Sequence, residues 1–122
     1  MRKIGLDRMQ VQAGSLPYAD QRRLEIARAI VAHPPLLLLD EPSAGMIPKE
    51  LDDLRTLVEE VRAGGTTVIC IEHNMRFILP LADEILVMNE GKRLVVGQPD
   101  EISKNPAVIE AYLGRRAIRV AG

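Results

Sequence analysis

Two adjacent carboxylates, Asp40 and Glu41, follow a run of four leucines and are the first candidates for chemistry in this chain. A continuous aliphatic run of this kind is typical of a strand buried on both faces of a parallel sheet. In open α/β sheets, ligands bind beyond the carboxyl ends of the strands, so the acidic pair stands where a binding site would form. The alternative is an ordinary strand-ending turn whose carboxylates only begin the next helix.

A second apolar run, residues 66–71, ends in the same way, with Glu72 and His73. If the two runs form neighbouring parallel strands, their ends lie about 5 Å apart or a small multiple of that distance. Glu41 and His73 would then face one shared pocket and could act on the same bound group. The alternative interpretation of His73 is a histidine that begins the following helix and bonds to the backbone.

The elements that must position these residues alternate between helices and strands. The predicted helices cover residues 17–32, 48–63, 74–81, 99–104 and 106–113, and the predicted strands cover residues 36–40, 66–71, 85–88 and 93–96. Residues 89–92 carry a turn signal between the last two strands. This order predicts an α/β fold with a mainly parallel sheet flanked by helices.

Apolar spacing predicts which helix faces are buried. The expected core positions of the two long helices are Leu24, Ile26, Ala27, Ile30 and Val31 in the first, and Leu51, Leu54, Val58 and Val61 in the second.

Composition and charge limit the classes of function. At 122 residues and 47% hydrophobic, the chain has the size of one domain. A net charge of −1 argues against a dedicated nucleic-acid binder. The single cysteine, Cys70, excludes a disulfide within the chain, suits a reducing cytosol and is interpreted as a core residue. No apolar run has the length of a membrane span, so we expect a soluble protein or one that reaches a membrane only through a partner.

Four motifs in order resemble the C-terminal half of the ATPase cassette of ABC transporters, from about residue 16 to residue 113. They are QRRLEIARAI in the first long helix, LLLLDEP, SAG and IEH. LPY before that helix and NPAVIEAYLG at residues 105–114 resemble the branched-chain amino acid uptake branch of the family. The chain carries no G-x-x-x-x-G-K-[ST], the phosphate-binding loop that such an acidic strand normally serves.

The resemblance implies a partial P-loop NTPase fold that lacks the Walker A strand, loop and helix. It divides the chain into four segments. These are a polar lead-in (1–16), the C-terminal part of the ATPase core (17–98), a helical extension of the branched-chain type (99–114) and a flexible tail (115–122).

The resemblance also assigns roles to the strand-end residues. Asp40 is the Walker B aspartate, which holds the hydration shell of Mg²⁺, a hard cation that keeps several of its waters. Glu41 is the general base that polarises the attacking water, because phosphoryl transfer depends on positioning and charge placement. His73 is the switch histidine, which contacts the γ-phosphate.

Seven further positions are carried over as nucleotide-contacting residues: Leu16, Pro17, Tyr18, Ala19 and Asp20 in the signature segment, and Ala44 and Gly45 in the D-loop. In the family, a Leu-Ser-Gly-Gly-Gln signature at a helix N-terminus grips the γ-phosphate bound by the opposite subunit. Here three of the differences from that pattern affect phosphate binding. Pro17 removes a hydroxyl and an N–H donor, Ala19 adds a Cβ, and Asp20 places a negative charge near an anion. The alternatives are an ordinary helix start, where Asp20 is favourable, and a plain β-to-α loop at residues 43–46.

The implied function is that of the ATP-binding and ATP-hydrolysing subunit of an ABC importer for branched-chain amino acids. ATP and Mg²⁺ are the implied ligands, and both require a P-loop that these residues lack, so the chain alone is expected to be inactive. The implied partners are a second ABC ATPase subunit or a missing N-terminal half, and membrane permease subunits at the inner face of the plasma membrane. Neither nucleic acid nor direct membrane insertion is expected.

One alternative function remains: a non-catalytic truncated cassette that pairs with or regulates intact ABC subunits. In either case the strand of the P-loop would lie beside the leucine strand. Its absence predicts that the isolated chain aggregates, dimerises or is marginally stable.

Overall fold

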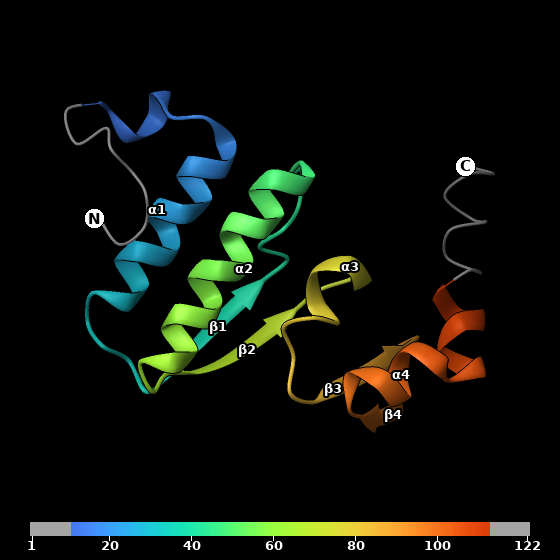
Figure 1. Cartoon of the computed structure of the whole chain (residues 1–122). Helices are drawn as coiled ribbons and strands as arrows, with labels where there is room; N and C mark the ends of the chain where they lie inside the picture. Colours follow the sequence, from blue (N-terminus) through green and yellow to red (C-terminus); the bar gives the residue numbers. More distant parts are fainter. Residues whose placement is uncertain (1–10, 113–122) are drawn as a thin grey trace. The chain divides into compact units, whose positions relative to one another are not determined.

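The computed structural model describes residues 11–112 of the chain (Figure 1). The chain forms two compact units that divide between Phe77 and Ile78. The predicted tail at 115–122, the predicted helix end at residues 113 and 114, and all of the predicted lead-in before residue 11 lie outside the described residues.

The first unit contains the elements that carry the candidate site. They are the short 3₁₀ helix η2 (Ala13–Ser15), α1 (Tyr18–Ile30), β1 (Leu36–Asp40), α2 (Pro48–Ala63) and β2 (Thr67–Ile71), followed by the start of α3 (Met75–Ile78). The predicted helix at 74–81 is thus shorter than expected. Pro80 explains the early end, because a proline disfavours the helical conformation of the residue before it.

Strands β1 and β2 pair in parallel, with Leu36 opposite Thr67 and Asp40 opposite Ile71 (Figure 1). In this register both strands end at the same pair, Asp40 and Ile71. Glu41 and Glu72 therefore each lie one residue beyond that last pair. The predicted neighbouring parallel strands are therefore observed, and their carboxyl ends meet at one edge of the small sheet.

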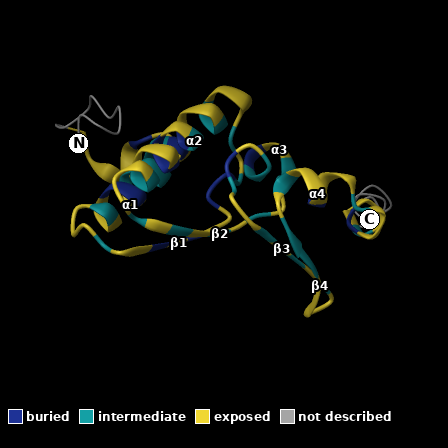
Figure 2. Ribbon diagram, turned by 60° about the horizontal axis from the view of Figure 1, so that its bottom comes forward, coloured by how far each residue is buried: buried dark blue, intermediate teal, exposed yellow. Residues whose placement is uncertain are grey.

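One face of this sheet is covered by helices, and the other face is open. Along β1, buried residues alternate with exposed ones. Leu37 and Leu39 are buried together with Ile26 and Ala27 of α1 and with Leu54, Leu57 and Val58 of α2, which line the inner side of the helices (Figure 2).

The opposite face exposes four aliphatic side chains: Leu36 (45% exposed), Leu38 (67%), Ile69 (52%) and Ile71 (62%). The expectation that the leucine run is buried on both faces is therefore wrong for the structure described. The physical reason is that, among the described strands, β1 pairs only with β2, and helices cover one side of that pair.

Two details of the predicted helix faces also differ. Val31 is exposed because α1 ends at Ile30, one residue before it. Leu57 of α2 is buried although it was not expected to be, whereas Leu51 and Val61 are only half-buried. The buried face of α2 therefore consists of Leu54, Leu57 and Val58, and is rotated slightly about the helix axis from the predicted face.

The second unit contains an antiparallel hairpin and short helices. Strand β3 (Ile85–Asn89) pairs with β4 (Lys92–Gly97) through a two-residue turn in which Glu90 and Gly91 both have positive φ, as a type I′ hairpin turn requires. α4 (Pro99–Lys104) follows, with Ile102 fully buried. The predicted turn between the last two strands is confirmed, and the structure adds that the two strands pair antiparallel.

Residues 106–112 are helical up to the end of the described chain. Asn105 begins this helix as predicted, because its Oδ1 accepts hydrogen bonds from the backbone N–H of Ala107 at 2.9 Å and of Val108 at 3.4 Å. The fold class is α/β, as expected, with parallel pairing in β1 and β2 and antiparallel pairing in β3 and β4. In residues 11–112, no helix has both the length and the apolar character needed to cross a membrane.

Candidate functional site

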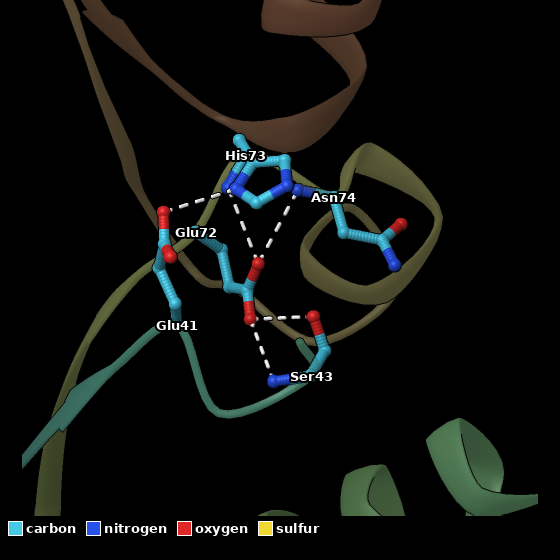
Figure 3. A network of polar contacts seen from close by, with 5 residues as sticks. All are labelled: Glu41, Ser43, Glu72, His73 and Asn74. Carbon is cyan, nitrogen blue, oxygen red and sulfur yellow. Dashed lines mark hydrogen bonds and ion pairs between the residues drawn. The ribbon is translucent and has the colours of Figure 1, made fainter. Parts of the chain in front are cut away.

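Glu41 and His73 lie in contact at the carboxyl ends of β1 and β2. The Nδ1 atom of His73 is 3.1 Å from Oε1 of Glu41 (Figure 3). Both side chains are about half exposed, at 45% for His73 and 52% for Glu41, so solvent and a ligand can reach them. The predicted juxtaposition is therefore present, and the ring of His73 bonds to a carboxylate rather than to the backbone of the next helix.

The backbone of Glu41 has an unusual conformation. Its φ is +46°, in the left-handed region that residues other than glycine seldom adopt. Its N–H donates to the carbonyl of Ile71 at 2.8 Å, which extends the parallel pairing by one step and fixes the residue against β2. Residues held in such conformations concentrate at functional sites, because the surrounding structure must hold them against strain of about 1–2 kcal/mol.

The carboxylate of Glu72 joins the loop after β1 to the loop after β2. Its Oε1 accepts hydrogen bonds from the backbone N–H of Ser43 at 2.9 Å and from the Ser43 hydroxyl at 2.5 Å. Its Oε2 accepts from the backbone N–H of His73 at 3.2 Å and of Asn74 at 3.3 Å (Figure 3). Ser43 is buried, so these bonds are largely shielded from water.

Sequence reasoning did not find this role of Glu72. The available signal was weak: an acidic residue directly after a strand, and a serine three residues after the neighbouring strand. Only the register of β1 and β2 shows that the two positions face each other.

Asp40 is the last residue of β1 and is exposed. It lines a shallow cavity of about 200 Å³ between α1 and β1, together with Arg22, Glu25 and Pro42. Within residues 11–112, no cluster of three or more His, Cys, Asp or Glu side chains could enclose a metal ion. A single exposed carboxylate does fit Mg²⁺, which is commonly bound by one or two carboxylates, phosphate oxygens and retained waters.

The predicted signature segment forms the start of α1. Leu16 and Ala19 are buried, Pro17 precedes the helix and is exposed, and Asp20 forms an ion pair with Arg23 at 3.6 Å. Among the described contacts, no hydrogen bond or ion pair joins residues 16–20 to Asp40, Glu41 or His73. The signature segment and the strand-end pair are therefore not joined by any of these polar contacts.

Tyr18 of the signature segment does lie against the loop after β1. A Cβ placed on Gly45 would be 3.6 Å from the Tyr18 ring, and Gly45 has a φ of +72° that suits glycine. Nε of Arg22 donates to the Tyr18 hydroxyl at 3.0 Å, and the guanidinium lies 5.4 Å from the ring centre. The hydrogen bond to Tyr18 is the main cause that raises the pKa of Arg22, against a smaller opposing effect of burial. Ala44 is half-buried beside Gly45.

Cys70 lies in β2, and burial raises the pKa of its thiol to about 12, with further contributions from the negative charges of Glu72 and Asp40. A thiol with so high a pKa is a poor nucleophile at neutral pH. The structure therefore supports the interpretation of Cys70 as a packing residue.

Comparisons with known proteins agree with the motifs and the fold. A family profile described as ABC transporter matches residues 1–44, and one described as branched-chain amino acid ATP-binding cassette transporter matches residues 92–118. The high-affinity branched-chain amino acid transport ATP-binding protein LivG of Salmonella typhimurium is 48% identical over 116 residues, covering 93% of this chain and 46% of that protein. The protein of the same description named BraF, from Pseudomonas aeruginosa, is 50% identical over 103 residues, covering 84% of this chain and 40% of that protein.

A solved structure shows the same fold. An ATP-binding cassette of an ABC transporter in its ADP conformation has a TM-score of 0.83 and 30% identity, covering 93% of this chain and 46% of that chain. The chain thus spans about half the length of the relatives that it matches.

The fold, the order of the motifs and these relatives define an ATPase cassette of the ABC transporter type, and the chain belongs to that family. Within the family it is similar to the branched-chain amino acid transport ATP-binding proteins LivG and BraF, and the profile of that description matches residues 92–118. The resemblance found from the motifs is confirmed.

Proposed function

We propose that the chain supplies the catalytic strand ends of the ATP-hydrolysing subunit of an ABC importer for branched-chain amino acids. The observation that carries this proposal is the contact of Glu41 with His73 at the ends of two neighbouring parallel strands. LivG and BraF, which are described as branched-chain amino acid transport proteins, support the substrate class.

In this proposal Glu41 is the general base. Its carboxylate is half exposed, so a water molecule can reach it, and its strained backbone is fixed to β2 by the bond to Ile71. A carboxylate held in this way orients the attacking water and accepts its proton as the phosphoryl group is transferred.

His73 is the proposed partner at the terminal phosphate. When Glu41 is ionised, Nδ1 of His73 carries the hydrogen of their contact, which leaves Nε2 on the opposite side of the ring. Within the described residues Nε2 makes no hydrogen bond. It can donate to a phosphate oxygen when the ring is protonated on both nitrogens, or when the contact with Glu41 opens and the ring changes tautomer.

Asp40 is the proposed holder of the waters around Mg²⁺, a role that suits an exposed carboxylate beside a cavity. The bound ion would reduce the charge on the phosphates. The signature segment, Leu16 to Asp20, and the D-loop residues Ala44 and Gly45 are proposed to face nucleotide.

The chain contains no Walker A sequence, so the proposal requires a P-loop from residues outside these 122 or from a partner chain. The proposed partners are a second ABC ATPase subunit and membrane permease subunits. They would hold the protein at the cytoplasmic face of the plasma membrane.

The test has two stages. Isothermal titration of the purified chain with Mg-ATP should show no micromolar binding. Adding a polypeptide that carries the P-loop half of LivG should then produce ATP hydrolysis, and Glu41→Gln should abolish that hydrolysis. Glu59→Gln, the same chemical change on the exposed face of α2, should leave the rate unchanged.

Three outcomes would count against the proposal. Micromolar binding by the chain alone would contradict the need for an added P-loop. Hydrolysis that persists in Glu41→Gln would remove its catalytic basis. Absence of hydrolysis, with inhibition of an intact ABC ATPase by the chain, would favour the non-catalytic regulatory function instead.

A further inference from the structure

We propose that Glu72 is a positioning residue that holds the loop after β1 and the loop after β2 in one arrangement, and so sets the contact between Glu41 and His73. The inference extends the proposed function, because it concerns the alignment of the same two residues. It stands on contacts within the first unit and on no bound ligand.

The hydrogen bonds of Glu72 are divided between the two loops. Oε1 serves the loop after β1 through the N–H and hydroxyl of Ser43, at 2.9 and 2.5 Å. Oε2 serves the loop after β2 through the N–H groups of His73 and Asn74, at 3.2 and 3.3 Å. One planar carboxylate therefore connects two backbone segments, and Glu72 lies 29 positions after Ser43 in the chain.

The positions of Glu41 and His73 follow from this arrangement. Ser43 stands two residues after Glu41 in the same turn, and the N–H of Ala44 donates back to the carbonyl of Glu41 at 3.2 Å. His73 is bound to Glu72 through its own backbone N–H. Figure 3 shows these contacts, and their loss removes a link between the turn that carries Glu41 and the backbone that carries His73.

All four donors face an acceptor, and this makes a specific substitution informative. Glutamine has the shape of glutamate but offers one acceptor oxygen and one NH₂ group. In Glu72→Gln, the NH₂ must point toward the N–H and hydroxyl of Ser43 or toward the N–H groups of His73 and Asn74. An isosteric change therefore removes at least one backbone hydrogen bond, that of Ser43 or those of His73 and Asn74, without creating a cavity.

The experiment is NMR spectroscopy of the chain without nucleotide, combined with denaturant unfolding. The chain has only two histidines, so the ring signals of His33 serve as an internal reference for those of His73. Glu72→Gln should shift the His73 ring signals and leave those of His33 in place. It should also move the amide proton of Ser43, His73 or Asn74 upfield and speed its hydrogen exchange about 10- to 100-fold, the range for the loss of a charge-assisted hydrogen bond.

Two variants control the result. Ser43→Ala keeps the backbone bond at 2.9 Å and removes only the hydroxyl bond, so it should shift the His73 ring less than Glu72→Gln does. Glu59→Gln on α2 should shift neither ring. If a variant unfolds, its denaturation midpoint will show it, and Ser43→Ala then carries the test.

The proposal is overturned if the His73 ring signals of folded Glu72→Gln coincide with those of the unchanged chain. It is also overturned if both rings shift equally, because that would report a general loss of structure. Neither result depends on ATP hydrolysis, so failure of this inference and failure of the proposed function can be told apart.

Discussion

The Glu41 carboxylate contacts Nδ1 of His73 at 3.1 Å although the two residues are 32 positions apart in the chain. The parallel register of β1 and β2 brings their backbones to the same edge, and the positive φ of Glu41 turns the chain there. Because both side chains are half exposed, their contact contributes little to stability, and exposed ion pairs are worth about 0–1 kcal/mol. The contact therefore adds little to folding, and its proposed role is in the chemistry at this edge of the sheet.

Glu41→Gln separates catalysis from stability. The amide keeps the shape and a hydrogen-bonding group toward His73 but cannot accept a proton from water, so hydrolysis in the completed ATPase should fall by at least about 100-fold. The free energy of unfolding should change by less than about 1 kcal/mol, because the pair is exposed. Steady-state ATPase assays and urea unfolding of the same preparation measure the two effects. A large loss of stability would show that the contact has a structural role.

The backbone strain at Glu41 predicts that glycine is more favourable than alanine at this position. A residue with a Cβ at a φ of +46° is strained, whereas glycine adopts this region freely. Glu41→Gly should therefore be more stable than Glu41→Ala by about 0.5–1 kcal/mol, after allowance for the greater freedom of glycine in the unfolded chain. Urea denaturation with equal slopes for both variants measures the difference. If the alanine variant is the more stable, the left-handed conformation at Glu41 is contradicted.

Neighbouring leucines on β1 provide a matched pair for the open sheet face. Leu37 is 4% exposed and Leu38 is 67% exposed, so the same truncation acts on opposite faces of one strand. Leu37→Ala should destabilise the chain by about 2–4 kcal/mol through lost burial and a cavity, whereas Leu38→Ala should cost about 0.5 kcal/mol or less. Thermal and urea unfolding of both variants compares them. Equal costs would mean that another surface covers Leu38.

The same open face predicts self-association of the chain. Exposed aliphatic side chains of β1 and β2 form a contiguous strip, and such strips promote association. Leu38→Lys should shift the sedimentation profile of the chain toward the monomer, and Lys49→Glu, a charge change on the exposed start of α2, should not. A chain that is already monomeric at high concentration would contradict this expectation.

Local patterns predicted most of the secondary structure, because prolines, glycines and apolar spacing act over a few residues. Pro48 begins α2 and Asn105 begins the helix at 106–112, as expected. The burial of the leucine run was predicted incorrectly, since burial depends on what lies beside β1 and not on the run itself. The strand-end pair was predictable from the two apolar runs and their acidic ends. The contacts of Glu72 with Ser43 could not be predicted from the sequence. They depend on the register of β1 and β2 and on the direction of side chains in a turn, and no local sequence pattern determines either.

Cys70 provides a pH-dependent prediction. Burial, with the charges of Glu72 and Asp40, raises the pKa of this thiol from 9.0 to about 12 in the folded chain. At neutral pH the folded state should therefore contain much less thiolate than an unperturbed cysteine, and a thiol reagent should react slowly until denaturant is added.

The raised pKa of the Cys70 thiol also makes the free energy of unfolding depend on pH. The folded chain keeps the thiol proton in a pH range where the unfolded chain has lost it. The contribution of Cys70 to the free energy of unfolding is therefore complete below about pH 9 and declines as the pH rises toward 12. Cys70→Ala removes the titrating group, so the gap in unfolding free energy between Cys70→Ala and the unchanged chain should narrow from about pH 8 to about pH 11. A gap that stays constant over this range, or rapid labelling of the folded chain at neutral pH, would show that the thiol is not held in its protonated form.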